Sequence, residues 1–166
     1  QKNWNMAINA AQDFKQIEKL TISQIEESST IIIRSALAID SLNIAQNECN
    51  TLLKSKTEAG AEAKYTIAYI EFRKGNFDVS EKKAFDLLSA GSPYQYWLAK
   101  SYILLGDIYV EKGDLFQAKY TYKSVMDNYE GDDLKKVAED KYNAILEIEK
   151  SQNKPKTQPI DDTNND

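Results

Sequence analysis

The chain has 166 residues, of which 42% are apolar and 28% charged, and a formal net charge of −5 at neutral pH. This length and apolar content suit one compact domain or a short array of repeats. The negative charge makes sequence-independent binding to phosphate backbones unfavourable, so nucleic acid is not an expected partner. The longest aliphatic runs, such as Ile31–Ile33, are far short of the roughly 20 residues in a membrane-spanning helix.

Helix-forming residues dominate every periodic segment, and no run shows the strict alternation of a half-buried strand. Helix-start signals are Ser23 with Glu26, Ser55 with Glu58, Ser92 with Pro93, and Asp114 with Gln117. The sequence predicts an all-α protein with helices over 3–18, 23–38, 42–54, 58–74, 78–89, 93–111, 115–128 and 133–150. Residues 151–166 contain one aliphatic residue and two prolines, which predicts a disordered tail.

The predicted helices repeat along the chain. Shifts of 38, 35 and 38 residues superimpose four of them, and four columns then keep one chemical character each. These columns are Trp4, Leu42, Phe77 and Leu115; Ala7, Ala45, Ser80 and Ala118; Ala11, Cys49, Ala84 and Tyr122; and Phe14, Leu52, Leu87 and Val125. The preceding helices share the columns Ile32, Ile67 and Leu105 and Ile33, Ala68 and Gly106, and the turns IDS, KGN and KGD coincide.

These units resemble the tetratricopeptide repeat (TPR) family, in which a helix pair of about 34 residues recurs with a pattern of large, small and aromatic residues. The last copy fits best, through Tyr102, Leu105, Gly106, Tyr109, Gly113, Leu115, Ala118, Tyr122 and Val125. The resemblance implies a right-handed superhelix of stacked antiparallel helix pairs. Its expected parts are the second helix of a truncated repeat (1–20), a degenerate first repeat (21–56), a second repeat (57–91), a third repeat (92–130) and a capping helix (131–150).

Gly106 lies inside a predicted helix, where glycine costs about 1 kcal/mol relative to alanine. We expect Gly106 to face Ala118 where the two helices of the last pair cross, as Ala68 and Ser80 would in the middle copy. Close approach of the two helices would then offset the lost helix propensity.

The two ends of the predicted array differ. The last helix has one apolar stripe that includes Leu134, Ala138 and Ile145, as expected for a helix that caps an array. The first helix matches the second member of a pair, through Trp4 and Phe14. This match favours a chain that is the C-terminal part of a longer, bacterial array. A single N-terminal capping helix is the alternative.

The common catalytic motifs are absent from the sequence: it has no phosphate-binding glycine loop and no histidine to act as a base. We therefore expect no enzymatic activity, catalytic residue, cofactor or metal site. Cys49 shares a column with Ala11 and Ala84, so it is predicted to be a small buried apolar residue rather than a nucleophile. The acidic pairs at 26–27, 132–133 and 161–162 are expected to be solvated.

Glu71 is a charged residue in the column of Tyr109, which should be packed inside. Either the helix rotates to bury Ile70 and Phe72, or the carboxylate is buried and pairs with a cation such as Arg34 or Arg73. We favour the rotation.

The TPR resemblance implies that the first helix of each pair lines a concave face that binds a peptide or another protein. The candidate partner-binding residues on this face are Arg34, Tyr65, Tyr69, Phe72, Arg73, Lys100 and Asp107. Aromatic residues and arginine suit such a surface because they give large desolvated contacts. The alternative is that the aromatic rings only pack against neighbouring helices. Tyr94, Tyr96 and Trp97 either cover the preceding pair or form an exposed rim.

The sequence therefore predicts a non-catalytic scaffold for protein interactions. The alternative is a structural module that forms a homo-oligomer through Trp4 and Phe14 at its open N-terminal edge. Analogy with long TPR arrays suggests the periplasm or the bacterial envelope, with the cytoplasm as the alternative.

Overall fold

The computed structural model describes residues 3–152, which form eight α-helices and no strand. The helices are α1 (Trp4–Phe14), α2 (Ile22–Ala38), α3 (Leu42–Leu52), α4 (Glu58–Arg73), α5 (Phe77–Ser89), α6 (Gln95–Glu111), α7 (Leu115–Asn128) and α8 (Asp132–Gln152). The all-α prediction is confirmed. Of the predicted disordered tail, Ser151 and Gln152 are helical, and the rest lies outside the described residues.

Three helix starts differ from the prediction. Helix α6 begins at Gln95 after the N-cap residue Tyr94, and not after Ser92. Thr21, and not Ser23, caps α2: its hydroxyl accepts from the Gln24 N–H at 3.2 Å, and the Gln24 side chain accepts from the Thr21 N–H at 2.9 Å. Ser55 donates to the Glu26 carboxylate at 2.6 Å, and the N-cap residue of α4 is Thr57. Asp114 caps α7 as predicted.

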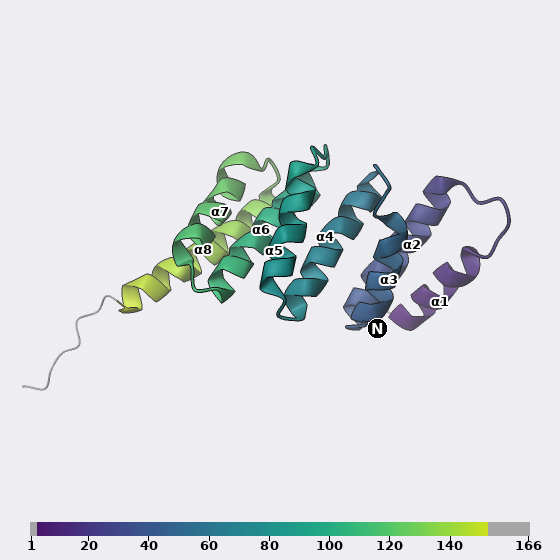
Figure 1. Ribbon diagram of the computed structural model, residues 1–166, viewed down its shortest axis with the longest axis horizontal. Coiled ribbons are helices and arrows are strands. Elements are labelled where there is room, and N and C mark those ends of the chain that lie inside the picture. Colours follow the sequence, from purple (N-terminus) through teal and green to yellow (C-terminus); the bar gives the residue numbers. More distant parts are fainter. Residues whose placement is uncertain (1–2, 153–166) are drawn as a thin grey trace, which may run out of the picture.

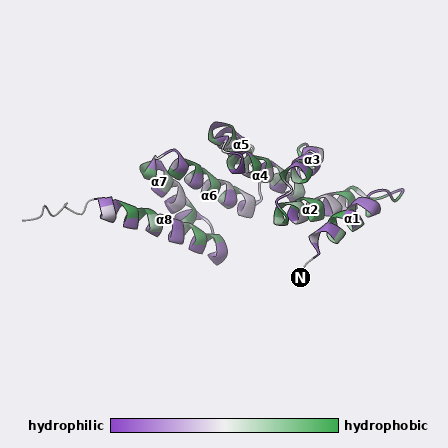
Figure 2. Cartoon of the chain, turned by 90° about the horizontal axis from the view of Figure 1, so that it is seen from below, coloured by the Kyte–Doolittle hydropathy of each residue, from purple (hydrophilic) through white to green (hydrophobic). Residues whose placement is uncertain are grey.

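The helices lie in a row from α1 to α8, and each packs against the next one along the chain (Figure 1). Helices α2, α4, α6 and α8 also pack on one another in succession. Within residues 3–152, no two of α1, α3, α5 and α7 pack together. The row therefore curves with the even-numbered helices on its inner side, and Figure 2 shows α3 and α5 on the outer side.

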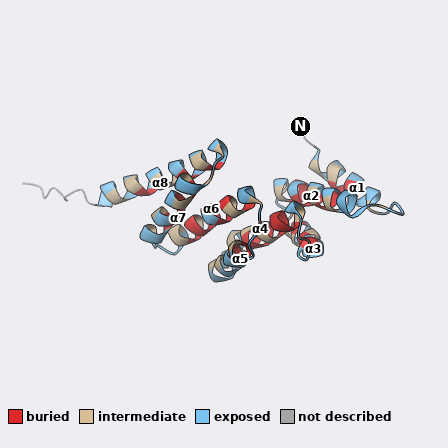
Figure 3. Ribbon diagram, turned by 90° about the horizontal axis from the view of Figure 1, so that it is seen from above, coloured by how far each residue is buried: buried red, intermediate tan, exposed pale blue. Residues whose placement is uncertain are grey.

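The core follows this arrangement, because a helix that has neighbours on several sides is the most deeply buried. Buried residues are concentrated on α4 and α6, in the middle of the row (Figure 3). Helix α1 has only two buried residues, Ile8 and Ala11. The inner side of α2, α4 and α6 is thus a rigid surface, held from behind by α3, α5 and α7.

The small residues allow the helices of a pair to approach closely, and one contact involves a residue that the prediction did not name. Ser80 donates a 2.7 Å hydrogen bond to the Ala68 carbonyl, so α4 and α5 meet closely where expected. At Gly106, a Cβ atom would lie 2.2 Å from Cε1 of Tyr122. The atoms nearest to Gly106 belong to the Tyr122 ring, which extends from one turn further along α7.

Gly106→Ala should lower the free energy of unfolding by about 1–3 kcal/mol, because the added methyl group would overlap the Tyr122 ring. Overlap should outweigh the better helix propensity of alanine. Chemical denaturation followed by circular dichroism would measure the loss. Repeating the substitution in a Tyr122→Leu background, where the ring is gone, should largely remove the cost. An equal loss in both backgrounds would show that the ring is not the obstacle.

Candidate functional site on the inner side of the curve

An ion pair joins α2 to α4 on the inner side. Arg34 binds Glu62 through two parallel hydrogen bonds, Nε to Oε1 at 2.7 Å and Nη2 to Oε2 at 2.6 Å. The Glu62 side chain is only 4% exposed, whereas that of Arg34 is 64% exposed. The hydrogen bond with Glu62 raises the pKa of Arg34. Arg34 therefore neutralises a buried carboxylate and still presents one edge of its guanidinium to solvent.

The ammonium group of Lys100 lies among three aromatic rings on the same side. Its Nζ atom is 4.7 Å from the centre of the Tyr65 ring, 5.2 Å from that of Trp97 and 5.6 Å from that of Tyr96. Cation–π attraction stabilises this position. Among residues 3–152 no carboxylate forms an ion pair with Lys100, and burial lowers its pKa. Lys100 is thus a partly desolvated cation that forms no ion pair within residues 3–152, although the charge of Glu62 acts on it.

Tyr65, Tyr69 and Arg73 follow one another at one-turn spacing along α4. The two tyrosine rings stack with their centres 6.2 Å apart. Arg73 donates to the Tyr69 hydroxyl at 3.2 Å and to Asp40 at 3.0 Å. Tyr65 and Tyr69 also pack against the apolar core between α4 and α6, so each ring has one side in the core.

The structure thus brings five of the seven candidate residues onto one surface. Two further residues belong to it: Glu62, which the sequence did not single out, and Tyr96, which was predicted either to cover the preceding pair or to form an exposed rim. We call this set the inner surface; it consists of Arg34, Glu62, Tyr65, Tyr69, Arg73, Tyr96 and Lys100. The one sequence signal for Glu62 is that it is opposite in charge to Arg34, which lies on the first helix of the preceding pair.

The other two candidates are engaged elsewhere. The Phe72 ring packs against Phe77 of α5, with ring centres 5.6 Å apart, so it lies within the helix pair. Asp107 accepts hydrogen bonds from the Tyr122 hydroxyl at 2.6 Å and from Lys141 at 2.7 Å. Asp107 therefore links α6 to α7 and α8.

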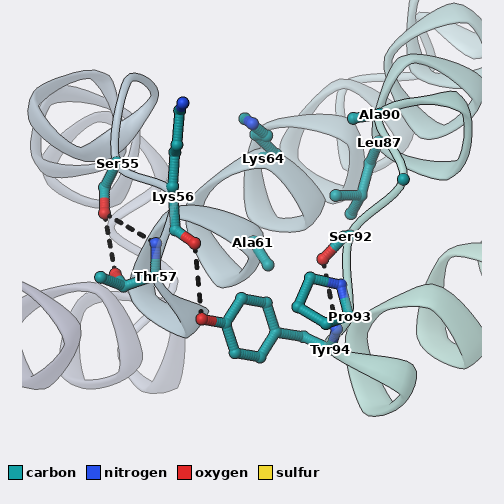
Figure 4. Close-up of a pocket in the computed structure, with 11 residues that line it drawn as sticks. Ser55, Lys56, Thr57, Ala61, Lys64, Leu87, Ala90, Ser92, Pro93 and Tyr94 are labelled. Carbon is teal, nitrogen blue, oxygen red and sulfur yellow. Dashed lines mark hydrogen bonds between the residues drawn. The ribbon is translucent and has the colours of Figure 1, made fainter.

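The aromatic residues before the last pair divide between the two expected roles. Trp97 packs against Ala61 and Leu87 of the preceding pair. The Tyr94 hydroxyl donates to the Lys56 carbonyl at 3.4 Å, across a hollow of about 420 Å³ (Figure 4). Tyr96, by contrast, is 37% exposed beside Lys100. Two of the rings cover the preceding pair, and the third contributes to the inner surface.

Comparison with known proteins bears on the fold. No family model matches the sequence, and no curated protein is significantly similar to it. Among solved structures, the crystal structure of MamA, a TPR-like protein, superimposes with a TM-score of 0.54 and 18% sequence identity, over 90% of this chain and 91% of MamA. The chain folds as a TPR-like α-solenoid. At this level of identity the likeness concerns the fold alone.

Within residues 3–152 of this TPR-like chain, no three His, Cys, Asp or Glu residues are grouped so that they could hold a metal ion. The same residues include no helix that is long and apolar enough to span a membrane.

The structure shows the surroundings of Cys49, the possible nucleophile, and of Glu71, the charged residue in a packed column. Cys49 is fully buried, and burial raises the pKa of its thiol to about 12, so the reactive thiolate is scarce at neutral pH. Glu71 binds Asn76 at 2.8 Å and Lys74 at 3.5 Å, and neither Arg34 nor Arg73 contacts it. Ile70 is fully buried, as the rotation of α4 requires, although the Glu71 side chain is still only 12% exposed.

Cys49 should react with iodoacetamide at pH 8 about a hundredfold or more slowly in the native protein than in denaturant, because reaction requires an opening of the fold. Mass spectrometry of timed samples would measure both rates. The matched control is Cys49→Ala combined with Asn50→Cys, which moves the thiol to the exposed neighbouring position and should label rapidly. Equal rates for the two proteins would contradict burial of Cys49.

Glu71→Gln should lower the free energy of unfolding near pH 7 by about 0.5–1 kcal/mol, because the neutral amide loses the charge that Lys74 and Asn76 stabilise. These contacts lower the pKa of Glu71 below the ordinary 4.5. Its contribution is therefore present above that value and is lost as the pH falls through the folded-state pKa.

Urea denaturation of both proteins at pH 7 and pH 3 would measure the difference. The difference in the free energy of unfolding between the original protein and Glu71→Gln should disappear at pH 3. The exposed Glu130 provides the control, since Glu130→Gln should change stability little at either pH. A gap that stays constant with pH would show that the charge of Glu71 is not the cause.

Proposed function

We propose that this TPR-like chain is a non-catalytic scaffold that binds a protein or peptide partner on its inner surface. The observation that carries the proposal is the position of Lys100, a half-buried cation that lies over aromatic rings and forms no ion pair with the described residues. The fold supplies the second support, because stacked helix pairs commonly use their concave face for binding.

The chemistry of the inner surface indicates what a partner would present to it. Lys100 and the exposed edge of Arg34 would attract a carboxylate of the partner. Tyr69 and Tyr96 offer ring surface beside these charges, where an apolar side chain would be desolvated. We therefore propose a partner segment in which an acidic residue lies next to an apolar one.

Arg34 is unsuitable for mutation in a binding test, because its removal would leave Glu62 buried and unpaired. Lys100→Gln combined with Arg73→Gln removes two positive charges from the inner surface and leaves that pair intact. Among the described residues, Arg73 binds the exposed Asp40 and Tyr69, so the fold should be retained without it. A pull-down with the full chain, read out by mass spectrometry, should show partners that are reduced about tenfold or more with this variant.

The matched control is Lys82→Gln with Lys123→Gln, which makes the same change of net charge on exposed positions of α5 and α7. Partners retained by the control and lost by the inner-surface variant would support the proposal. Partners retained equally by all three proteins would contradict it. Circular dichroism would verify that both variants are folded.

One observation favours self-assembly as a second candidate function. Met6, Ile17 and Ile22, at the N-terminal edge, are 66%, 55% and 76% exposed. Exposed apolar side chains gathered at one edge are typical of surfaces that another molecule covers. Two copies that met through α1 and α2 would bury them.

We also propose that these residues form the C-terminal part of a longer array. Helix α1 packs on α2 as α3 packs on α4 and α5 on α6, so it has the place of the second helix of a pair. The first helix of that pair has no counterpart in residues 3–152.

A further inference from the structure

An open groove of about 500 Å³ lies between α1 and α2 at the N-terminal edge of the row. Its lining includes Ala11, Phe14, Ser28 and Ile31, and its acidic residue is Glu27. Apolar surface predominates. The equivalent positions in the later helix pairs indicate what the groove accommodates.

Two residues that line the groove, Phe14 and Ile31, are exposed, although the equivalent positions in the later pairs are buried. Phe14 is 38% exposed, whereas Leu52, Leu87 and Val125 in its column are 4%, 1% and 2% exposed. Ile31 is 42% exposed, whereas its equivalents Thr66 and Leu104 are 2% and 3% exposed. Among the described residues, these two recurring positions are therefore exposed at the N-terminal edge and buried in the later pairs.

The helix that covers the next equivalent groove is α2. Its residues Ile33 and Leu37 pack against Cys49, Leu52 and Ala63, which are the counterparts of Ala11, Phe14 and Ser28. Arg34, between Ile33 and Leu37 in the chain, pairs with Glu62. Glu62 is the counterpart of Glu27, whose carboxylate has no ion-pair partner within residues 3–152. The groove between α1 and α2, with the carboxylate of Glu27, thus matches the apolar and charged side chains with which α2 packs on α3 and α4.

We propose that the groove between α1 and α2 accommodates an amphipathic helix that precedes α1 in the same polypeptide, antiparallel to α1 and with the side chains of α2. This helix would place two aliphatic residues, four positions apart, over Ala11 and Phe14. A Lys or Arg directly after the first of them would pair with Glu27. The inference rests on the proposed longer array and is independent of partner binding to the inner surface.

The register of the chain supports an occupant from the same polypeptide. Residues 1–3 align with the turns IDS, KGN and KGD, which connect the first helix of a pair to the second. Asn3 caps α1 through a 3.2 Å hydrogen bond from the Met6 N–H, as Asp114 caps α7. A short turn of this kind holds two helices together at a high effective concentration.

Helix α8 of a second copy is a poorer occupant because the charges on its outer side pair within the helix. Lys136 lies 2.8 Å from Asp140, and Lys150 lies 2.7 Å from Glu147. Burying these groups against Phe14 and Ile31 would carry a desolvation cost.

The test adds the missing helix to the chain. Residues 21–41, which comprise α2 and its turn, are duplicated and joined directly to Trp4, so that the added turn takes the place of residues 1–3. The melting temperature should rise by about 5 °C or more, because Phe14 and Ile31 become buried. Adding Phe14→Glu should abolish most of this gain, since the carboxylate would face the added helix.

The matched control carries Ile33→Asp and Leu37→Asp in the added copy alone, and its melting temperature should stay near that of the original chain. Equal melting temperatures for the two fusions would overturn the proposal. Sedimentation of the original chain gives a second readout: a dimer that Phe14→Glu dissociates would assign the groove to a second copy and would also overturn it. Either result leaves the pull-down on the inner surface unaffected, so the two proposals can fail separately.

Discussion

The packing of each even-numbered helix into the groove of the following pair is the interaction on which the rest of this structure depends. Ile33 of α2 lies against Cys49 and Ala63, and α4 meets Ala84 and Leu104 in the next step. Neither helix of a pair could bury its apolar residues alone, because each pair offers only one layer. Stability in such an array comes mainly from the interfaces between neighbours. The same interfaces fix the curvature, since within residues 3–152 the even-numbered helices contact one another and the odd-numbered helices do not.

The inner surface is a consequence of this packing. Glu62 is buried where α4 meets α2, and a buried carboxylate is tolerated only with a good partner. Arg34 meets that requirement and in doing so is held at the surface with a fixed orientation. Lys100 is positioned in a similar way by Tyr65 and Trp97, whose rings are part of the interface between α4 and α6. Groups that are rigid before binding lose little entropy when a partner arrives, so these structural contacts suit the inner surface to the binding that we propose.

The sequence was most informative where one chemical property recurs. The buried columns, such as that of Leu52 and Leu87, predicted the helices, their pairing and the burial of Cys49. It was less informative where the structure depends on a contact between different residue types in different repeats. The pairing of Arg34 with Glu62 occurs once, so no column reveals it. Likewise, Gly106 was correctly read as a place of close approach, but the ring that needs the space belongs to Tyr122 because a long side chain reaches beyond its own turn.

The two ends of the row differ in the side chains that they expose. At the C-terminal end, α8 buries Leu134, Ala138 and Ile145 and covers its outer side with Lys136, Glu139 and Asp140, which pair among themselves. At the N-terminal edge, Phe14 and Ile31 occupy columns that are covered in the later pairs, and they stay exposed. Within residues 3–152, the apolar contact that holds the row together is therefore uncovered at the N-terminal edge, whereas exposed charged residues of α8 pair with one another.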